Sequence, residues 1–198
     1  LVYGNAVHDA LKQWGFSVQK GQPFTKDQFM LAFESFLQER ELLTEAEKQR
    51  LLKLGEESLP RYFHEHLESL HPCIAHIEHP VSTHLRDIPI TGKLDRIDRM
   101  SQDSSSVRVI DFKTGRPKSE SEILKEGDYF RQLVFYALLL EHGMPHLEPK
   151  EFILEFVGEG EHEPVRRVFQ INEAQKKDLS AIIQKVWAKI LALDFTPI

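Results

Sequence analysis

Two strand-like segments each carry a carboxylate at a position where an apolar residue is expected. Residues 92–98 read Gly-Lys-Leu-Asp-Arg-Ile-Asp, and residues 109–115 read Val-Ile-Asp-Phe-Lys-Thr-Gly. Side chains alternate between the two faces of a strand, so Asp111 and Lys113 project to the same side. The second segment therefore presents an acid and a base on one face of the predicted sheet.

The linker between these segments, residues 100–106, contains three consecutive serines and reads as a hairpin loop. A hairpin centred on Asp103 without a bulge places Asp95 directly opposite Asp111. Like charges in directly opposed positions repel each other, and one of the two should have a raised pKa. A divalent cation that prefers oxygen ligands would relieve this repulsion, so the pair predicts a metal site. Taken singly, Asp95 reads as a polar residue near a turn and Asp111 as a strand-edge partner of Lys113.

If the metal site hydrolyses a phosphodiester, Lys113 has a catalytic role in addition to balancing charge. Its ammonium would hold the attacking water and offset the charge that builds on the phosphoryl group. We therefore take Asp95, Asp111 and Lys113 as the candidate catalytic residues.

Two further spacings put polar residues on one face of a predicted helix. Gly4 and His8 are four residues apart, and the glycine allows that face to approach a sheet closely. Gln132 and Tyr136 have the same spacing within a strongly apolar helix, so an inward-facing pair needs polar partners. The structural alternative is a lone helix histidine, and a glutamine and a tyrosine satisfied within the core.

The apolar periodicity predicts helices and strands in a definite order. Helices are expected at 4–14, 26–39, 44–70, 129–142 and from about 172 to 193, and strands at 74–85, 88–99, 107–113, 151–157 and 165–171. Helices first, then strands, then a helix, two strands and a helix predict an α/β (α+β) fold with a central mixed sheet flanked by helices.

Composition narrows the class of protein. The chain has 198 residues, a net charge of −6 and one cysteine, Cys73, which excludes an intramolecular disulfide framework. No apolar run approaches the ~20 residues of a membrane span, and there is no signal peptide, so we expect a cytoplasmic protein without a membrane partner. Both ends look cut, so we expect a single domain, residues 1–198, excised from a longer protein.

Basic residues gather around the carboxylate hairpin despite the negative net charge. A local field of this kind can attract a polyanion even when the whole chain is acidic. Arg96, Arg116, Lys118 and Arg131 are therefore expected to contact substrate phosphates rather than read bases.

In this order and at these spacings, Gly4–His8, Gly92–Asp98, Asp111–Gly115 and Gln132–Tyr136 resemble the motifs of a RecB-type nuclease of the PD-(D/E)xK superfamily. The resemblance implies a restriction-endonuclease-like core, with residues 25–70 as a helical insert. It also implies that His8, Asp95, Asp111 and the backbone carbonyl of Phe112 bind Mg²⁺ or Mn²⁺, that Lys113 is catalytic, and that Gln132 and Tyr136 support the site and touch DNA.

Such domains commonly form the C-terminal nuclease of superfamily 1 (UvrD/Rep-like) helicases in DNA repair and recombination. The resemblance therefore implies DNA and helicase domains as partners, and it favours an exonuclease over an endonuclease. Many members hold an iron–sulfur cluster; its cysteines are missing here, so this chain does not support one, although a full-length protein could. The alternatives are an inactive nucleic-acid-binding or scaffolding relative within a helicase, and a metal-dependent hydrolase of small phosphate esters.

Overall fold

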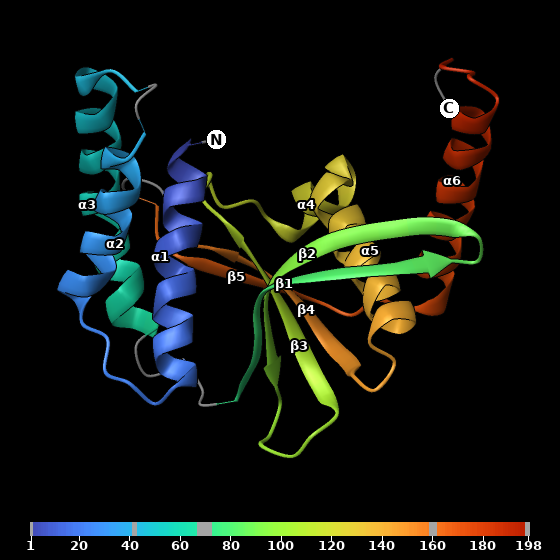
Figure 1. Cartoon of the computed structure of the whole chain (residues 1–198), viewed down its shortest axis with the longest axis horizontal. Helices are drawn as coiled ribbons and strands as arrows, with labels where there is room; N and C mark the ends of the chain where they lie inside the picture. The colour runs from blue at the N-terminus through green and yellow to red at the C-terminus, as the bar shows by residue number, and fades with distance from the viewer. Residues whose placement is uncertain (1, 41–42, 67–72, 159–161, 197–198) are drawn as a thin grey trace.

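The computed structural model describes residues 2–40, 43–66, 73–158 and 162–196, and within them six helices flank a five-stranded sheet (Figure 1). In chain order the elements are α1 (Val2–Gln19), α2 (Lys26–Gln38), α3 (Glu45–His66), β1 (Ile74–Leu85), β2 (Ile88–Arg99), β3 (Ser106–Lys113), α4 (Glu120–Glu126), α5 (Asp128–Gly143), β4 (Glu148–Phe156), β5 (Val165–Phe169) and α6 (Glu173–Leu191).

The sheet has the strand order β1-β2-β3-β4-β5, and only β3 and β4 run parallel. A parallel pair needs a crossover connection, and α4 and α5 provide it. The predicted mixed sheet with flanking helices is therefore confirmed. The strand from 88 to 99 and the one before it, from 74 to 85, have the predicted bounds.

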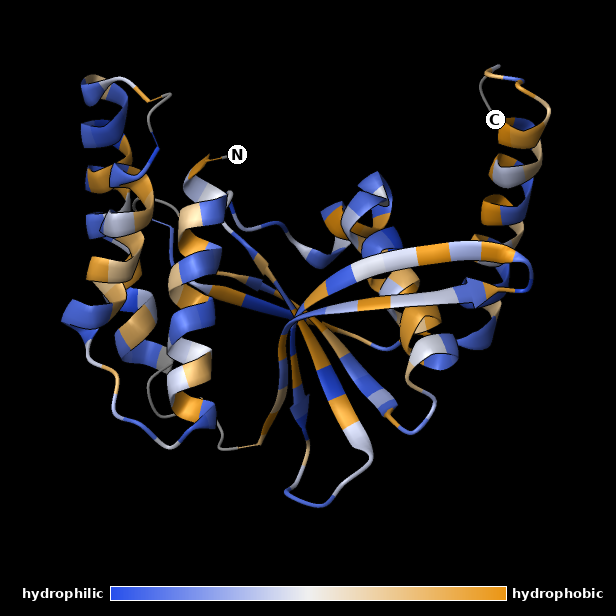
Figure 2. Ribbon diagram, viewed as in Figure 1, coloured by the Kyte–Doolittle hydropathy of each residue, from blue (hydrophilic) through white to orange (hydrophobic). Residues whose placement is uncertain are grey.

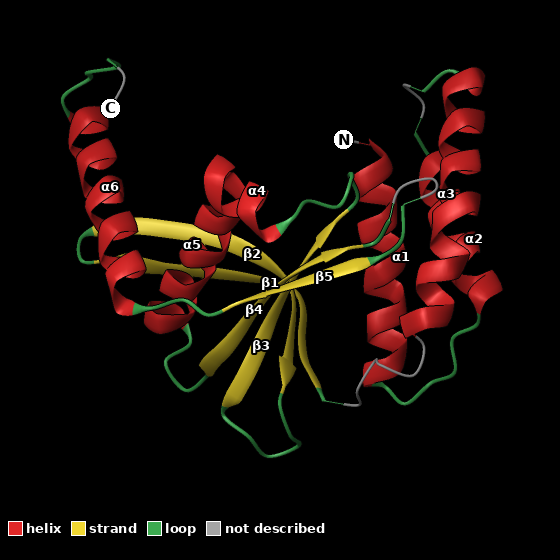
Figure 3. Ribbon diagram, turned by 180° about the vertical axis from the view of Figure 1, so that it is seen from behind, coloured by secondary structure: helices red, strands yellow, loops and turns green. Residues whose placement is uncertain are grey.

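The two faces of the sheet bury different helices, α1 to α3 on one side and α5 on the other (Figures 1 and 3). Apolar and polar residues alternate along several strands (Figure 2), as expected for a sheet covered in this way. On β3, Ile110 and Phe112 join the core under α1 to α3, whereas Val109 joins the core under α5. Asp111, which follows this alternation, is directed to the α5 side.

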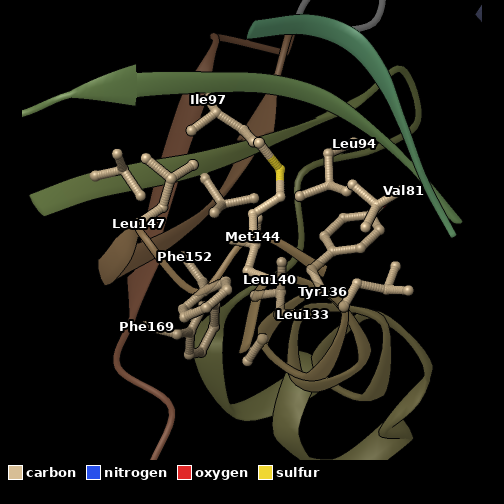
Figure 4. Close-up of a cluster of buried hydrophobic side chains, with 14 of the residues drawn as sticks. Val81, Leu94, Ile97, Leu133, Tyr136, Leu140, Met144, Leu147, Phe152 and Phe169 are labelled. Carbon is tan, nitrogen blue, oxygen red and sulfur yellow. The ribbon is translucent and has the colours of Figure 1, made fainter. Parts of the chain in front are cut away.

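The α5 core fixes how closely that helix lies on the sheet. Leu140 of α5 and Met144 at its C-cap pack with Leu94 and Phe152 of the strands (Figure 4). A Cβ on Gly92 would lie 2.6 Å from a methyl carbon of Leu139, so only glycine permits this approach. The close approach brings polar side chains of α5 against the strand that carries Asp111.

Capping residues account for the starts of most helices, including one helix that the apolar periodicity does not predict. Thr25, Thr44 and Asn172 each form a capping box at the start of α2, α3 and α6. Ser119 forms the same box with Glu122 at the start of α4, a helix that the apolar periodicity did not predict because it is only seven residues long. No helix in the described part of the chain is both long and apolar enough to cross a bilayer.

Candidate functional site

Three carboxylates form a row across three adjacent strands. The register of β2 and β3 runs through Arg96 opposite Ile110, and continuing it by one residue places Asp95 opposite Asp111, as predicted. The register of β1 and β2, which pairs Ile77 with Arg96 and His79 with Leu94, places Glu78 opposite Asp95 in the same way. The site therefore holds one more carboxylate than expected.

The ladder between β2 and β3 opens at this row. The backbone N–H of Phe112 donates to Asp95 Oδ2 at 2.8 Å instead of to a carbonyl of β2. Glu78 has a φ of +48°, in the left-handed region that non-glycine residues adopt at a cost of order 1–3 kcal/mol. Both irregularities turn carboxylate oxygens toward one another, which is costly unless a positive charge lies among them.

His8 reaches the row from α1. Its Nδ1 lies 3.7 Å from Glu78 Oε1 and 3.6 Å from Asp95 Oδ2, and its Nε2 lies 3.1 Å from the carbonyl oxygen of Phe112. A carbonyl can only accept, so Nε2 carries the proton of that hydrogen bond and neutral His8 keeps a lone pair on Nδ1 toward the carboxylates. A Cβ on Gly4 would lie 3.1 Å from Thr114 Oγ1, so the glycine one turn earlier lets α1 approach β3 closely, as expected.

Nδ1 of His8 and one oxygen each of Glu78 and Asp95 lie within 4.8 Å of one another. This is a donor set that can enclose one cation. Asp111 is not part of this close group among the described residues, and the carbonyl of Phe112 contacts His8. Of the predicted ligands, His8 and Asp95 are brought together, Glu78 joins them, and Asp111 lies beside the group.

The electrostatics of the row favour a cation among the carboxylates. Burial raises the pKa of Asp95 to about 6, and the charge of Asp111 adds to this effect while His8 opposes it. Burial acts against protonation of His8, but the hydrogen bond with Glu78 and the charges of Asp95 and Asp111 outweigh it and raise its pKa. The expectation that one aspartate has a raised pKa is confirmed, and the residue is Asp95.

Asp111 lies deeper, in a network with α5. Its Oδ1 accepts hydrogen bonds from Gln132 Nε2 and from the hydroxyl of Tyr136, both at 2.9 Å. Burial and the charges of Asp111 and Asp95 raise the pKa of Tyr136, so its hydroxyl stays a donor. The predicted inward-facing pair on α5 therefore has its polar partner.

Lys113 completes this network. Its Nζ lies 2.6 Å from Asp111 Oδ2, donates to Gln132 Oε1 at 2.7 Å and lies 4.6 Å from the ring centroid of Tyr129. Oδ2 of Asp111 is buried, yet it accepts no hydrogen bond of good geometry from any described residue. The ammonium of Lys113 is thus the ion-pair partner of Oδ2, and a carboxylate oxygen paired in this way still has a lone pair for a cation.

The row lies at the wall of a cleft of about 740 Å³. Residues of α1, α2, the strands and α5 line it: Gly4, Asn5, His8, Asp9, Lys12, Phe36, Arg40, Glu78, Lys93, Asp95, Thr114, Gln132 and Tyr136. Lys93 forms an ion pair with Glu78. A polymer substrate could therefore reach the carboxylates from solvent.

The predicted phosphate contacts are not brought together at this cleft. Arg96 is buried on the other face of β2 and binds both carboxylate oxygens of Asp98. Its neighbour Asp95 faces the site, and strand alternation directs consecutive side chains to opposite faces, so Arg96 was wrongly grouped with the site. Arg116 and Lys118 pair with acidic residues of α4, and Arg131 pairs with Asp128.

The missed residue, Glu78, carried a signal in the sequence. Pairing residues symmetrically about the two-residue turn Arg86–Asp87 places Glu78 opposite Asp95. The same pairing about the loop centred on Asp103 places Asp111 opposite Asp95. The predicted carboxylate ligands come from the second hairpin alone and therefore omit Glu78.

Comparisons with known proteins agree with this architecture. The family model of the PD-(D/E)XK nuclease superfamily matches residues 1–198. A crystal structure of a "Putative exonuclease" from Eubacterium rectale has a similar fold, with a TM-score of 0.52 and 14% identity, over 94% of this chain and 67% of that one. Among curated proteins, no significant match was found.

Proposed function

The chain belongs to the PD-(D/E)XK nuclease superfamily, and from that premise we propose that it hydrolyses DNA phosphodiester bonds with a divalent metal ion. The observation that carries the proposal is the row of Glu78, Asp95 and Asp111, with His8 and Lys113 beside it. An inactive relative would have no need to hold like charges in a row or to retain a buried oxygen without a hydrogen bond.

The residues present fit Mg²⁺ or Mn²⁺. Nucleases of this superfamily depend on divalent metal ions, and the close group here offers two carboxylates and one imidazole, with the Asp111–Lys113 ion pair nearby. Carboxylates suit both ions, and an imidazole suits transition metals such as Mn²⁺ better than Mg²⁺. When bound there, the ion supplies Lewis-acid charge that activates water and offsets charge on the phosphoryl oxygens.

The chain's own groups orient the reaction. Lys113 is fixed by Asp111 and Gln132, so its ammonium is held in place to position the attacking water and to stabilise negative charge in the transition state. Tyr136 and Gln132 hold Oδ1 of Asp111 from α5, and the second oxygen, Oδ2, pairs with Lys113. Such preorganisation contributes to rate because no side chain must reorient during the reaction.

We propose an exonuclease that works with helicase domains, in the same chain or in a partner, during DNA repair or recombination. The named activity of the Eubacterium rectale protein and the motif order support the exonuclease part. Arg116, Lys118 and Arg131 stay candidates for phosphate contacts, because each is exposed enough to exchange its carboxylate partner for a phosphate.

End-labelled linear DNA and circular DNA, each single- and double-stranded, test this proposal. With Mg²⁺ or Mn²⁺ the purified chain should shorten the linear substrates from an end and leave the circles intact, and EDTA should stop the reaction. Cutting of circles would indicate an endonuclease. An absence of cleavage with either metal, together with retained DNA binding, would favour the inactive relative.

Metal affinity should decrease in mild acid. Asp95 must be ionised and His8 neutral to bind a cation, and both have raised pKa values, so protons compete with the metal below about pH 6. We expect the Kd for Mn²⁺, measured by isothermal titration calorimetry, to rise at least tenfold between pH 7.5 and pH 5.5. An unchanged Kd over this interval would place the ion elsewhere.

Glu78 offers a separate test, because it was not part of the sequence motifs. Glu78→Gln keeps the size of the side chain and removes its charge, so Mn²⁺ affinity should fall by about tenfold or more, a loss of at least ~1.4 kcal/mol. Glu148→Gln, at an exposed position on β4, is the matched control and should bind Mn²⁺ like the parent. Equal affinities of all three proteins would remove Glu78 from the ligand set.

A further inference from the structure

The wall of the cleft contributed by α2 differs in chemistry from the carboxylate wall. Phe36 and Arg40 line the cleft together with His8, Glu78 and Asp95. Phe36 lies in the last turn of α2, and Arg40 follows the C-cap Glu39. The guanidinium carbon of Arg40 lies over the Phe36 ring, 4.2 Å from its centroid, which is a cation–π contact.

Phe36 packs against the core at its edge, and Arg40 lies outside the core. The helix buries Phe29, Phe33 and Leu37, which are spaced by four and form one stripe. Phe36 is displaced from that stripe and is only partly covered, and Arg40 is exposed beyond the end of the helix. An aromatic ring and a guanidinium at the edge of a cleft are therefore available to a ligand.

The charge of Arg40 distinguishes it from the other cations that line the cleft. Lys93 pairs with Glu78, and Lys12 lies 3.8 Å from Asp9. Within the described ranges, no carboxylate lies within ion-pair distance of Arg40. Its guanidinium lies over the ring of Phe36 instead, so its described partner is aromatic carbon and not a carboxylate.

We propose that Phe36 and Arg40 form a stacking site for an unpaired nucleobase of the substrate, across the cleft from the carboxylates. Bases stack on aromatic rings and on guanidinium planes largely regardless of sequence, and a stacked cation also attracts the adjoining phosphate. A base inside a duplex has both faces covered by its neighbours, so only an unpaired base can enter such a stack. The inference rests on the proposed nuclease function and adds its substrate class, DNA with an unpaired strand or end.

The test measures binding in EDTA, so that it is independent of cleavage. The probes are a fluorescein-labelled single-stranded oligothymidylate and an oligonucleotide of the same length and charge made of abasic sites. The parent should bind the base-bearing probe about tenfold more tightly, since stacking on one aromatic site contributes this much. Phe36→Leu and Arg40→Lys should each reduce that ratio toward one while leaving the affinity for the abasic probe nearly unchanged.

Phe16→Leu, at an exposed aromatic residue of α1, and Arg86→Lys, in the β1–β2 turn, are the matched controls and should keep the parent's ratio. Arg40→Lys retains the charge at an exposed position, so a folding defect cannot explain its result. Equal affinity of the parent for both probes, or an unchanged ratio in both Phe36→Leu and Arg40→Lys, would overturn the inference. A base-dependent ratio without metal-dependent cleavage would retain the stacking site and overturn the nuclease proposal instead.

Discussion

Replacing Lys113 with alanine is expected to slow DNA cleavage by about 10²–10³-fold, the usual effect of removing one fixed donor that stabilises transition-state charge. The structure holds this ammonium between Asp111 and Gln132, so no other described cation can take its place without rearrangement. Lysine is not a metal ligand, so the metal should still bind. Single-turnover cleavage in saturating Mn²⁺ measures the loss of the chemical step directly.

Lys150→Ala, at an exposed lysine of β4, removes the same charge away from the site and serves as the control. It should cleave at the parent's rate. If Lys113→Ala retained more than half of the parent's rate, Lys113 would be only a counter-ion of Asp111, as its pairing alone would suggest.

The second large effect concerns stability with and without metal. The fold raises the pKa of Asp95 from 3.8 to about 6. Protonation of Asp95 therefore stabilises the folded state fully below about pH 4, and this stabilisation is lost as the pH rises through 6. Asp95→Asn removes that unfavourable charge and keeps an oxygen that can accept from the N–H of Phe112. At pH 8 without metal, the variant should therefore melt at the parent's temperature or above it.

Mn²⁺ should reverse this order. A ligand at 100 times its Kd stabilises the folded state by about 2.7 kcal/mol, or about 5–10 °C in a chain of this length. The parent should gain this shift, and Asp95→Asn should gain almost none because it lacks a ligand. Asp103→Asn, in the exposed loop between β2 and β3, has the same net charge as the variant and should shift like the parent. Equal shifts in Asp95→Asn and the parent would show that the ion binds elsewhere.

The fold was largely predictable because local signals agreed with the packing. Alternating apolar residues gave β1 and β2 with correct bounds, and the expected starts of α2, α3 and α6 coincide with the capping boxes in the structure. α4 was not predicted because seven residues are too few to show an apolar period, although Ser119 and Glu122 have the spacing of a capping box at its start. The order of the strands depends on a crossover through α4 and α5, which no local pattern specifies.

The site was predictable where residues pair symmetrically about a hairpin loop and where one helix face carries two polar residues. That reasoning placed Asp95 opposite Asp111 and put Gln132 and Tyr136 on one inward face of α5, where both bind Asp111 in the structure. It failed for Arg96, because residues close in sequence on a strand point to opposite faces. The contribution of α2 could not be predicted, since contact between Phe36 and the cleft depends on how α2 packs against α1.

The fold tolerates the row of carboxylates although their charges are not fully balanced. Carboxylates in one row repel, and the fold offsets this with Lys93 and Lys113, a backbone N–H and hydrogen bonds from α5. The charge balance stays incomplete at Asp95, and that imbalance is what favours a divalent cation over water at this point.

The most direct test of the central claim compares cleavage by the parent and by Asp111→Asn, purified in the same way. Both are incubated with end-labelled single-stranded DNA in Mn²⁺ and in EDTA, and the products are resolved over time. We predict cleavage by the parent in Mn²⁺ only, and none above background by Asp111→Asn, which excludes a contaminating nuclease. Equal cleavage by the two proteins, or cleavage by the parent in EDTA, would contradict a metal-dependent nuclease built on this row of carboxylates.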